Sequence, residues 1–158
     1  MGAIDGSAYQ SEQDWLQTTY IDLNPRAAHV VACDFFDFTA ASPFDIVCLS
    51  LVMNFVGAPE KRGQMLLHAH ALLKAEGYLY IVLPLPCMTN SRYMNAAHFR
   101  QIVETNGYKV VQQYDSTRLS YWLLQRQAGF DATQCTPYAK GLLEDGVKRN
   151  NFCIVLKK

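Results

Sequence analysis

Three apolar stretches of this sequence each carry a polar residue near their carboxyl end. Asn54 comes near the end of LSLVMNF (49–55), Asp22 lies in YIDLN and Asp34 lies in ACDFF. A buried polar side chain costs free energy unless it finds a hydrogen-bonding partner. For Asn54, two interpretations follow: either the strand has left the core by this residue, or the amide faces a ligand that needs it.

The two carboxylates suit a nucleoside ligand. At the end of a strand, Asp22 could accept both hydroxyls of a ribose. Asp34, twelve positions later, could accept an adenine amino proton while Phe35 packs on the ring. The alternative is that each Asp is a turn or cap residue. Gly2 and Gly6, in GAIDG, could let a ligand approach the backbone, or they form a plain turn.

Histidines and cysteines give no pattern of a catalytic or metal centre. The five cysteines include no CxxC pair, so we expect reduced thiols and no zinc site. His68 and His70 are two positions apart, about 200° around a helix, and do not face one metal ion. The sequence also contains no P-loop and no Ser-His-Asp order.

Alternating strands and helices are expected to position these residues. Short β-rich segments predict strands over 19–22, 30–33, 46–52, 78–83, 109–114 and 152–156. Apolar runs such as IVCLSLV are typical of strands covered on both faces, as in a parallel sheet. Helical spacing and stop signals predict helices over 11–17, 59–76 and 91–106. We therefore predict an α/β, Rossmann-like, doubly wound sheet in a single domain over residues 1–158, with 125–151 as an irregular excursion.

The glycines come early for this fold. In a doubly wound sheet the first glycine-rich turn follows a central strand, and MGAIDG has no residues before Gly2 to form that strand. We therefore expect the sheet of this chain to lack its first strand, as in an N-terminally truncated protein.

The composition is that of a globular chain without strong charge. Half of the 158 residues are hydrophobic, and 14 basic residues balance 14 acidic ones. Nucleic-acid binding would therefore need a local basic patch. The candidates, each with a plain solvated surface as the alternative, are Lys61 with Arg62, Arg92 with Arg100, and Lys148, Arg149, Lys157 and Lys158. No apolar stretch reaches the roughly 18 residues of a membrane span, and the start has no signal-peptide pattern.

Several motifs together resemble one family of RNA methyltransferases. The motifs are GAIDG, IDLN, CDFFDF, FDIVCLSLVMNFV, KRGQMLLHAHALL and IVLPLPCMTNSRY. In combination they resemble the fungal nucleolar large-subunit (25S) ribosomal RNA adenine-N1 methyltransferases, a family that includes the metazoan S-adenosylmethionine sensor. The resemblance covers nearly the whole chain and is strongest from Ile21 to Tyr93.

The resemblance implies a class I enzyme of ribosome biogenesis in the nucleolus. Such an enzyme transfers a methyl group from S-adenosylmethionine to N1 of an adenine in large-subunit rRNA. Gly2 then matches the glycine that lines the methionine part of the cofactor, Asp22 the acidic residue on the ribose, and Asp34 the residue beside the adenine. Asn54 falls where these enzymes place the residues that meet the target base.

An amide suits this chemistry. The lone pair of adenine N1 is free at neutral pH, so the reaction needs alignment rather than a strong base. Asn54 could pair with the Watson–Crick edge of the base, or it caps the following turn. In NSRY, Arg92 could contact phosphate and Tyr93 could stack on a base. The alternative for Arg92 is an ion pair with a surface carboxylate.

Two other functions remain open from the sequence. A non-catalytic S-adenosylmethionine sensor that regulates a protein partner would use the same cofactor pocket. A small-molecule methyltransferase would need a substrate lid, which only residues 125–151 could supply. The main prediction gives large-subunit rRNA as the partner, with neither a membrane nor a metal.

Overall fold

The computed structural model describes residues 7–157, and the chain divides into two compact units. The N-terminal unit is Met1–Thr39 and the C-terminal unit is Ala40–Lys158. Each unit is described by itself. The prediction of a single methyltransferase domain over the whole chain stays a prediction.

The N-terminal unit contains one short pair of strands. Its elements are η1 (Ser7–Glu12), β1 (Ile21–Asp22) and β2 (Val31–Ala32). The strands pair in parallel, with Ile21 opposite Val31, so the predicted strands at 19–22 and 30–33 are confirmed in a shorter form. The predicted helix over 11–17 is wrong. A 3₁₀ helix ends at Glu12 instead, and the Glu12 carboxylate accepts a hydrogen bond from the Trp15 indole N–H at 2.7 Å.

The C-terminal unit is built on a four-stranded mixed sheet. Its strands are β3 (Phe44–Ser50), β4 (Leu73–Pro84), β5 (Tyr108–Asp115) and β6 (Leu119–Arg126), in the order β3-β4-β6-β5. Strand β3 is parallel to β4, whereas β6 is antiparallel to both of its neighbours. The sequence predicted a parallel sheet, but the observed sheet is mixed.

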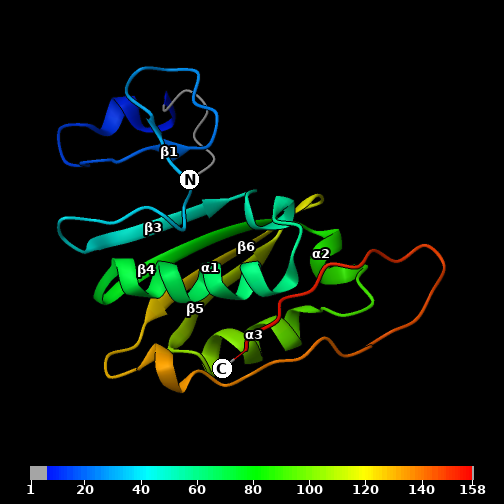
Figure 1. The fold of residues 1–158 in the computed structure, drawn as a ribbon. Helices are drawn as coiled ribbons and strands as arrows, with labels where there is room; N and C mark the ends of the chain where they lie inside the picture. Colours follow the sequence, from blue (N-terminus) through cyan, green and yellow to red (C-terminus); the bar gives the residue numbers. More distant parts are fainter. Residues whose placement is uncertain (1–6, 158) are drawn as a thin grey trace. The chain divides into compact units, whose positions relative to one another are not determined.

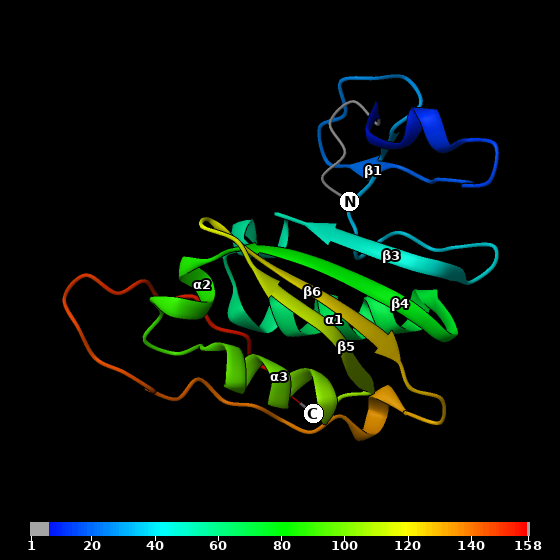
Figure 2. The ribbon, with the colours of Figure 1, turned by 180° about the vertical axis from the view of Figure 1, so that it is seen from behind.

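Helices cover one face of this sheet. The helices of the C-terminal unit are η2 (Met53–Phe55), α1 (Pro59–Leu72), α2 (Pro86–Thr89), α3 (Ala96–Glu104) and η3 (Ala132–Gln134). In Figure 1, α1 and α3 lie in front of the strands, and in Figure 2 they lie behind them. Helix α3 begins later than predicted because the Asn95 side chain caps it, accepting a hydrogen bond from the His98 amide at 2.7 Å.

Two strand assignments from the sequence are corrected. The apolar run at 152–156 was predicted to be the last strand, but it lies outside the sheet as an extended segment, here called the C-terminal segment. Its Val155 amide donates to the carbonyl of Pro59 at 3.0 Å, and Leu156 pairs only with Tyr138. The last strand is instead β6, for which no strand was predicted. An apolar run reports burial, and here it is buried against the helices rather than in the sheet.

The C-terminal segment passes very close to α1 at Gly63. A Cβ atom on Gly63 would lie 2.1 Å from the Val155 carbonyl oxygen and 2.8 Å from Cδ2 of Leu156. Next to it, the buried Arg62 side chain donates through Nη1 to the carbonyl of Cys153 at 2.8 Å. The absence of a side chain at position 63 therefore lets the segment lie directly on the helix.

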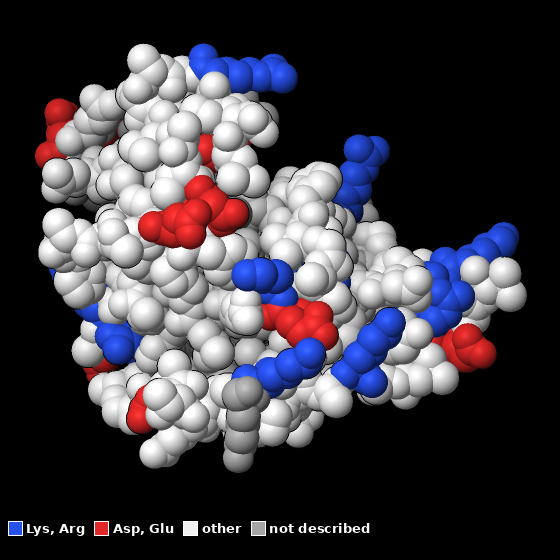
Figure 3. All heavy atoms as spheres, viewed as in Figure 1, with Lys and Arg blue, Asp and Glu red and all other residues white. Residues whose placement is uncertain are grey.

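The sheet face opposite α1 and α3 carries aromatic side chains. Tyr80, Tyr114, Tyr121 and Leu123 line a hollow of about 380 Å³ on this face, and no helix of the C-terminal unit covers it in Figure 2. On the face seen in Figure 3, basic and acidic side chains are scattered and form no single basic patch. Across residues 7–157 no helix has the length and apolarity to cross a membrane, and no group of three His, Cys, Asp or Glu is placed to hold a metal ion.

Gly63→Ala is expected to lower the free energy of unfolding by about 1–3 kcal/mol, because the new methyl group must displace the C-terminal segment. Thermal unfolding followed by circular dichroism measures the effect. The matched control is Gly141→Ala, where nothing lies within 4 Å of the added Cβ. Equal melting temperatures for the two variants would contradict the close approach at Gly63.

Candidate functional site

A sharp turn follows β3 and presents Asn54. Leu51 has a φ of +54°, in the left-handed region, and its amide donates to the Val82 carbonyl at 2.9 Å. For a residue other than glycine this conformation costs about 1–2 kcal/mol, and such strain is concentrated at functional turns. Met53, which directly precedes Asn54, is fully buried. The turn thereby fixes the backbone on both sides of Asn54.

The amide oxygen of Asn54 is buried without a partner. Among the described residues, only Oδ1 of Asn54 and Nε2 of His70 are buried side-chain polar atoms that lack a hydrogen bond. An unsatisfied buried acceptor costs about 1–3 kcal/mol. The alternative in which Asn54 caps the following turn has no support, since this oxygen accepts no backbone N–H. His70 is held between the rings of Tyr108 and Phe130, as in a packing role.

A cavity of about 510 Å³ opens beside Asn54. Its walls come from the turn after β3, from α1 and from the last 20 residues of the chain, and they include Asn54, Arg62, Lys140, Asn150, Asn151 and Phe152. The lining contains two basic residues and no carboxylate. The cavity is therefore suited to a ligand with an acceptor or an anionic group.

Arg62 is a buried cation held by carbonyl groups. Its Nε donates to the Val56 carbonyl at 2.8 Å and its guanidinium stacks over the Phe152 ring at 4.7 Å. Burial lowers the pKa of Arg62. Burial also raises the pKa of the neighbouring Cys87 thiol to about 11, so this thiol stays neutral. Within residues 7–157 no carboxylate forms an ion pair with Arg62, and its positive charge is not cancelled at the cavity wall.

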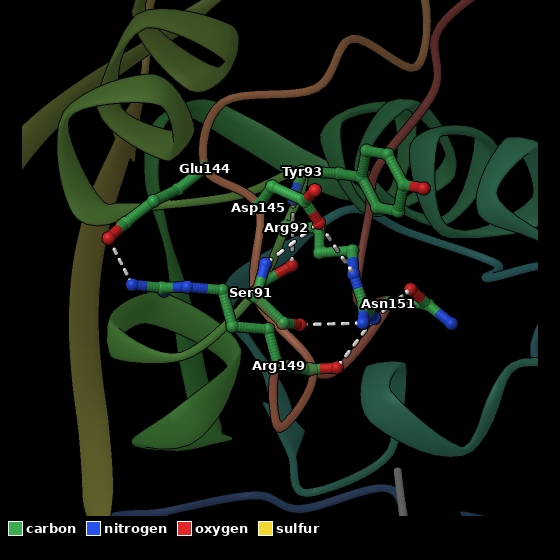
Figure 4. Close-up of polar contacts among 8 residues, drawn as sticks. Ser91, Arg92, Tyr93, Glu144, Asp145, Arg149 and Asn151 are labelled. Carbon is green, nitrogen blue, oxygen red and sulfur yellow. Dashed lines mark hydrogen bonds and ion pairs between the residues drawn. The ribbon is translucent and has the colours of Figure 1, made fainter.

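The Arg92 guanidinium binds the loop formed by residues 140–151, here called the 140–151 loop. It donates to the carbonyls of Arg149 and Gly146, both at 2.7 Å, and to Oδ1 of Asn151 at 3.0 Å. Its Nε lies 3.7 Å from the Asp145 carboxylate. Figure 4 shows these partners converging on Arg92 from one loop. The guanidinium is thus engaged with the loop, and its predicted contact with RNA phosphate stays a prediction.

Tyr93 lies beside the only lysine of the cavity wall. Nζ of Lys140 lies 4.2 Å from the centre of the Tyr93 ring, in a cation–π contact. The Tyr93 amide donates to Oγ of Ser91 at 3.1 Å, and Tyr93 itself is half-buried. This ring therefore positions a cation, and its predicted stacking on a base is not tested by the contacts.

The N-terminal unit brings two of the predicted cofactor residues to one edge. Because β1 and β2 run parallel, their carboxyl ends meet, and the Cys33 amide donates to the Asp22 carbonyl at 3.1 Å. Oδ1 of Asp22 accepts from the Asn24 amide and Oδ1 of Asp34 from the Phe36 amide, each at 2.9 Å. Both carboxylates therefore form turns, which was the alternative interpretation from the sequence. The second oxygen of each forms no hydrogen bond with residues 7–157.

The other two predicted cofactor residues are Phe35 and Gly2. Phe35 is only 3% exposed and packs edge-on against Phe36, with ring centres 6.1 Å apart. Its ring thus belongs to the core of the N-terminal unit. Gly2 lies outside the described residues.

Three residues of the site were not found from the sequence. Phe55 directly follows Asn54 and is 81% exposed. Lys140 and Asn151 lie in the irregular stretch, where no periodicity marks inward-facing positions. The signal for Phe55 was present, because an aromatic residue adjoins the amide at a strand end.

Comparison with known proteins gives one family. The sequence profile of the Bmt2 family, described as 25S rRNA (adenine(2142)-N(1))-methyltransferase, matches residues 1–154. Two curated relatives are each 35% identical to this chain: the 25S rRNA (adenine(2142)-N(1))-methyltransferase of Saccharomyces cerevisiae over 72% of the chain, and the 25S rRNA adenine-N(1) methyltransferase of Schizosaccharomyces pombe over 75%. The aligned part spans only 33% and 46% of these relatives.

A solved structure shows the fold. The N-methyltransferase NodS from Bradyrhizobium japonicum, in complex with S-adenosyl-l-homocysteine, superposes with a TM-score of 0.50 and 16% sequence identity. The match covers 68% of this chain and 65% of NodS. The predicted Rossmann-like, class I methyltransferase fold is confirmed.

Arg92→Lys is expected to loosen the 140–151 loop, because lysine keeps the charge but cannot form the fork of hydrogen bonds to two carbonyls and an amide. Each bond to a charged group contributes about 1.5–3 kcal/mol, so loop amides should exchange with solvent roughly 10- to 150-fold faster. Hydrogen-exchange mass spectrometry reports this at the amides of Leu143 and Asn150. The control is Arg100→Lys, which alters an exposed ion pair with Glu104 and a cation–π contact with Trp122 and does not touch the loop. Unchanged exchange in Arg92→Lys would show that Arg92 does not hold the 140–151 loop.

Proposed function

The chain belongs to the Bmt2 family of 25S rRNA (adenine(2142)-N(1))-methyltransferases, and we propose from this that the protein methylates N1 of an adenine in large-subunit rRNA, with S-adenosylmethionine as donor. The observation that carries the proposal within the structure is the unpartnered amide oxygen of Asn54, on the strained turn after β3. The work of such an enzyme lies in ribosome biogenesis, and we place it in the nucleolus.

The Asn54 oxygen has the right polarity for an adenine. As an acceptor it can take a hydrogen from the exocyclic amino group, which leaves the N1 lone pair free to attack. Asn54 would hold the adenine so that N1 faces the methyl group that bound S-adenosylmethionine would supply. The product base is cationic and no proton moves in this step, so the site needs alignment and no general base.

Phe55 also supports the proposal that the target adenine binds at the turn after β3. Its side chain is 81% exposed immediately after Asn54. Adenine N1 is occupied in a base pair, so the target must be unpaired or flipped out before it reacts. An exposed ring beside the amide gives a flipped base a surface on which to stack, worth about 1–3 kcal/mol.

The N-terminal unit supplies groups for the cofactor. The second carboxylate oxygens of Asp22 and Asp34 are available at one strand edge, where a ribose diol and an adenine amino group could donate to them. The turns through Oδ1 hold both carboxylates in place. Gly2 and Phe35 complete the proposed cofactor set, although the Phe35 ring is largely covered. When bound, the cofactor supplies an electrophilic methyl group.

The alternative of a non-catalytic sensor uses the cofactor groups but has no use for a base-facing amide. Asn54 and Phe55 therefore favour the enzyme. In the assay proposed next, cofactor binding that releases a protein partner, without methyl transfer to any RNA, would favour the sensor instead.

Asn54→Ala in the full-length protein is expected to slow methyl transfer about 10- to 100-fold, because the adenine loses the group that aligns it, while cofactor affinity is kept. The assay incubates unmodified large-subunit rRNA with cofactor and measures 1-methyladenosine by mass spectrometry of nucleosides. The control is Gln101→Ala, which removes an exposed amide from α3. Methylation confined to proteins or small molecules would overturn the proposed function, and a wild-type rate for Asn54→Ala would overturn the role of this residue.

A further inference from the structure

Resting on the proposed function, we propose that the cavity walled by the 140–151 loop binds the phosphate of the target nucleotide, through Lys140 and the amide nitrogen of Asn151, with Arg92 as the residue that positions this loop. The ligand class is an unpaired RNA nucleotide. All residues involved belong to the C-terminal unit.

The cavity offers donors and positive charge on one wall. Lys140 presents an ammonium group there and forms no ion pair in the part of the chain that the structure describes. The charge of the buried Arg62 adds to the field at the same cavity. Of the other basic residues in this loop region, Arg149 pairs with Glu144 and Arg92 lies beside Asp145. Lys148 is exposed and does not line the cavity. Lys140 and Arg62 are thus the basic residues of the cavity wall.

Arg92 determines which way the Asn151 amide points. By donating to Oδ1 of Asn151 at 3.0 Å, it leaves the NH₂ group of this amide for another partner. Figure 4 shows the amide oxygen directed to Arg92 and the nitrogen directed away from it. An oriented NH₂ group and an ammonium group on one cavity wall suit a phosphate, which is acceptor-only at its exposed oxygens.

The rest of the loop is held as firmly as this amide. Asn150 donates through Nδ2 to the Pro86 carbonyl at 2.7 Å and accepts from the Phe152 amide at 2.9 Å. The amides of Leu143 and Glu144 both donate to the Arg92 carbonyl. Binding groups on such a loop are preorganised, so less conformational entropy is lost when a ligand binds.

Asn54 differs from Lys140 and Asn151, because its amide oxygen is an acceptor and requires a hydrogen-bond donor on the ligand. Asn54 lines the same cavity, and its amide oxygen is buried and has no partner in residues 7–157. A ligand that satisfies both walls must carry an anionic acceptor at one end and a donor at the other. An adenosine nucleotide has both, in its phosphate and its amino group, and a cavity of about 510 Å³ is in the usual range for a small ligand.

The test measures RNA binding apart from catalysis. A labelled single-stranded RNA of nine nucleotides with one central adenosine is titrated with the full-length protein at several salt concentrations, by fluorescence anisotropy. Lys140→Ala is expected to weaken binding three- to tenfold and to lower the slope of log K against log salt by about 0.7, the value for one phosphate contact on a single strand. Asn151→Asp should weaken binding at least as much, because it keeps the acceptor for Arg92 but replaces the donor with a negative charge.

The matched control is Lys148→Ala, an exposed lysine of the same loop that does not line the cavity. Its RNA affinity should remain within twofold of the wild type. An equal loss for Lys148→Ala and Lys140→Ala would show that only general charge attraction acts, and would overturn the proposal. So would an unchanged affinity for Lys140→Ala.

A double-mutant cycle separates positioning by Arg92 from direct contact. If Arg92 acts through Asn151, Arg92→Lys should weaken RNA binding in the wild type but add little in the Asn151→Asp background. Additive losses would overturn the positioning role. Cofactor affinity, measured by calorimetry, should be the same in all four proteins.

The two proposals can fail separately. Methyl transfer to adenine N1 with no dependence of RNA affinity on Lys140 would refute the phosphate site and leave the proposed function standing. RNA affinity that depends on Lys140 and Asn151, without any methyl transfer, would refute the proposed reaction and support the nucleotide site.

Discussion

The C-terminal unit depends on one contact, the packing of the C-terminal segment against α1. At this contact Arg62 is buried and donates to the segment, and Gly63 has no side chain that would hold the segment away. Arg62 donates to Val56, just after the Asn54 turn, and to Cys153, at the far end of the chain. A buried charge that loses its partners is strongly destabilising, so these bonds leave the side chain little freedom. One residue therefore joins two walls of the cavity, although Val56 and Cys153 are 97 positions apart in the sequence.

Arg92 acts in a similar way on the 140–151 loop. It too is a cation held mainly by carbonyl oxygens, and it orders a loop that has no regular secondary structure of its own. Carbonyl groups restrain a guanidinium without cancelling its charge, unlike a carboxylate. Two such anchors give an irregular segment the rigidity that binding groups need.

The sequence predicted those parts of the fold in which local pattern and tertiary role agree. The helical spacing at 59–76 predicted α1, although the helix ends at Leu72 and residues 73–76 belong to β4. The apolar runs at 46–52 and 78–83 predicted the parallel pair β3 and β4. The run at 152–156 was misassigned because burial under a helix and burial in a sheet select the same residues. In the site, Asn54 was found because an amide interrupts an apolar run. Lys140 and Asn151 were not, because their places depend on contacts of Arg92 that are distant in sequence.

The site departs from the rule that buried polar groups find partners, because the buried amide oxygen of Asn54 lacks one. Asn54 offers an acceptor, whereas Lys140 and Asn151 offer donors, and all three line one cavity. Yet the Asn54 oxygen accepts a hydrogen bond from none of the described residues. An unsatisfied buried acceptor such as this oxygen costs about 1–3 kcal/mol, which a residue selected only for stability would avoid. Groups kept apart by rigid anchors, on a turn that is itself strained at Leu51, are instead complementary to something that enters between them.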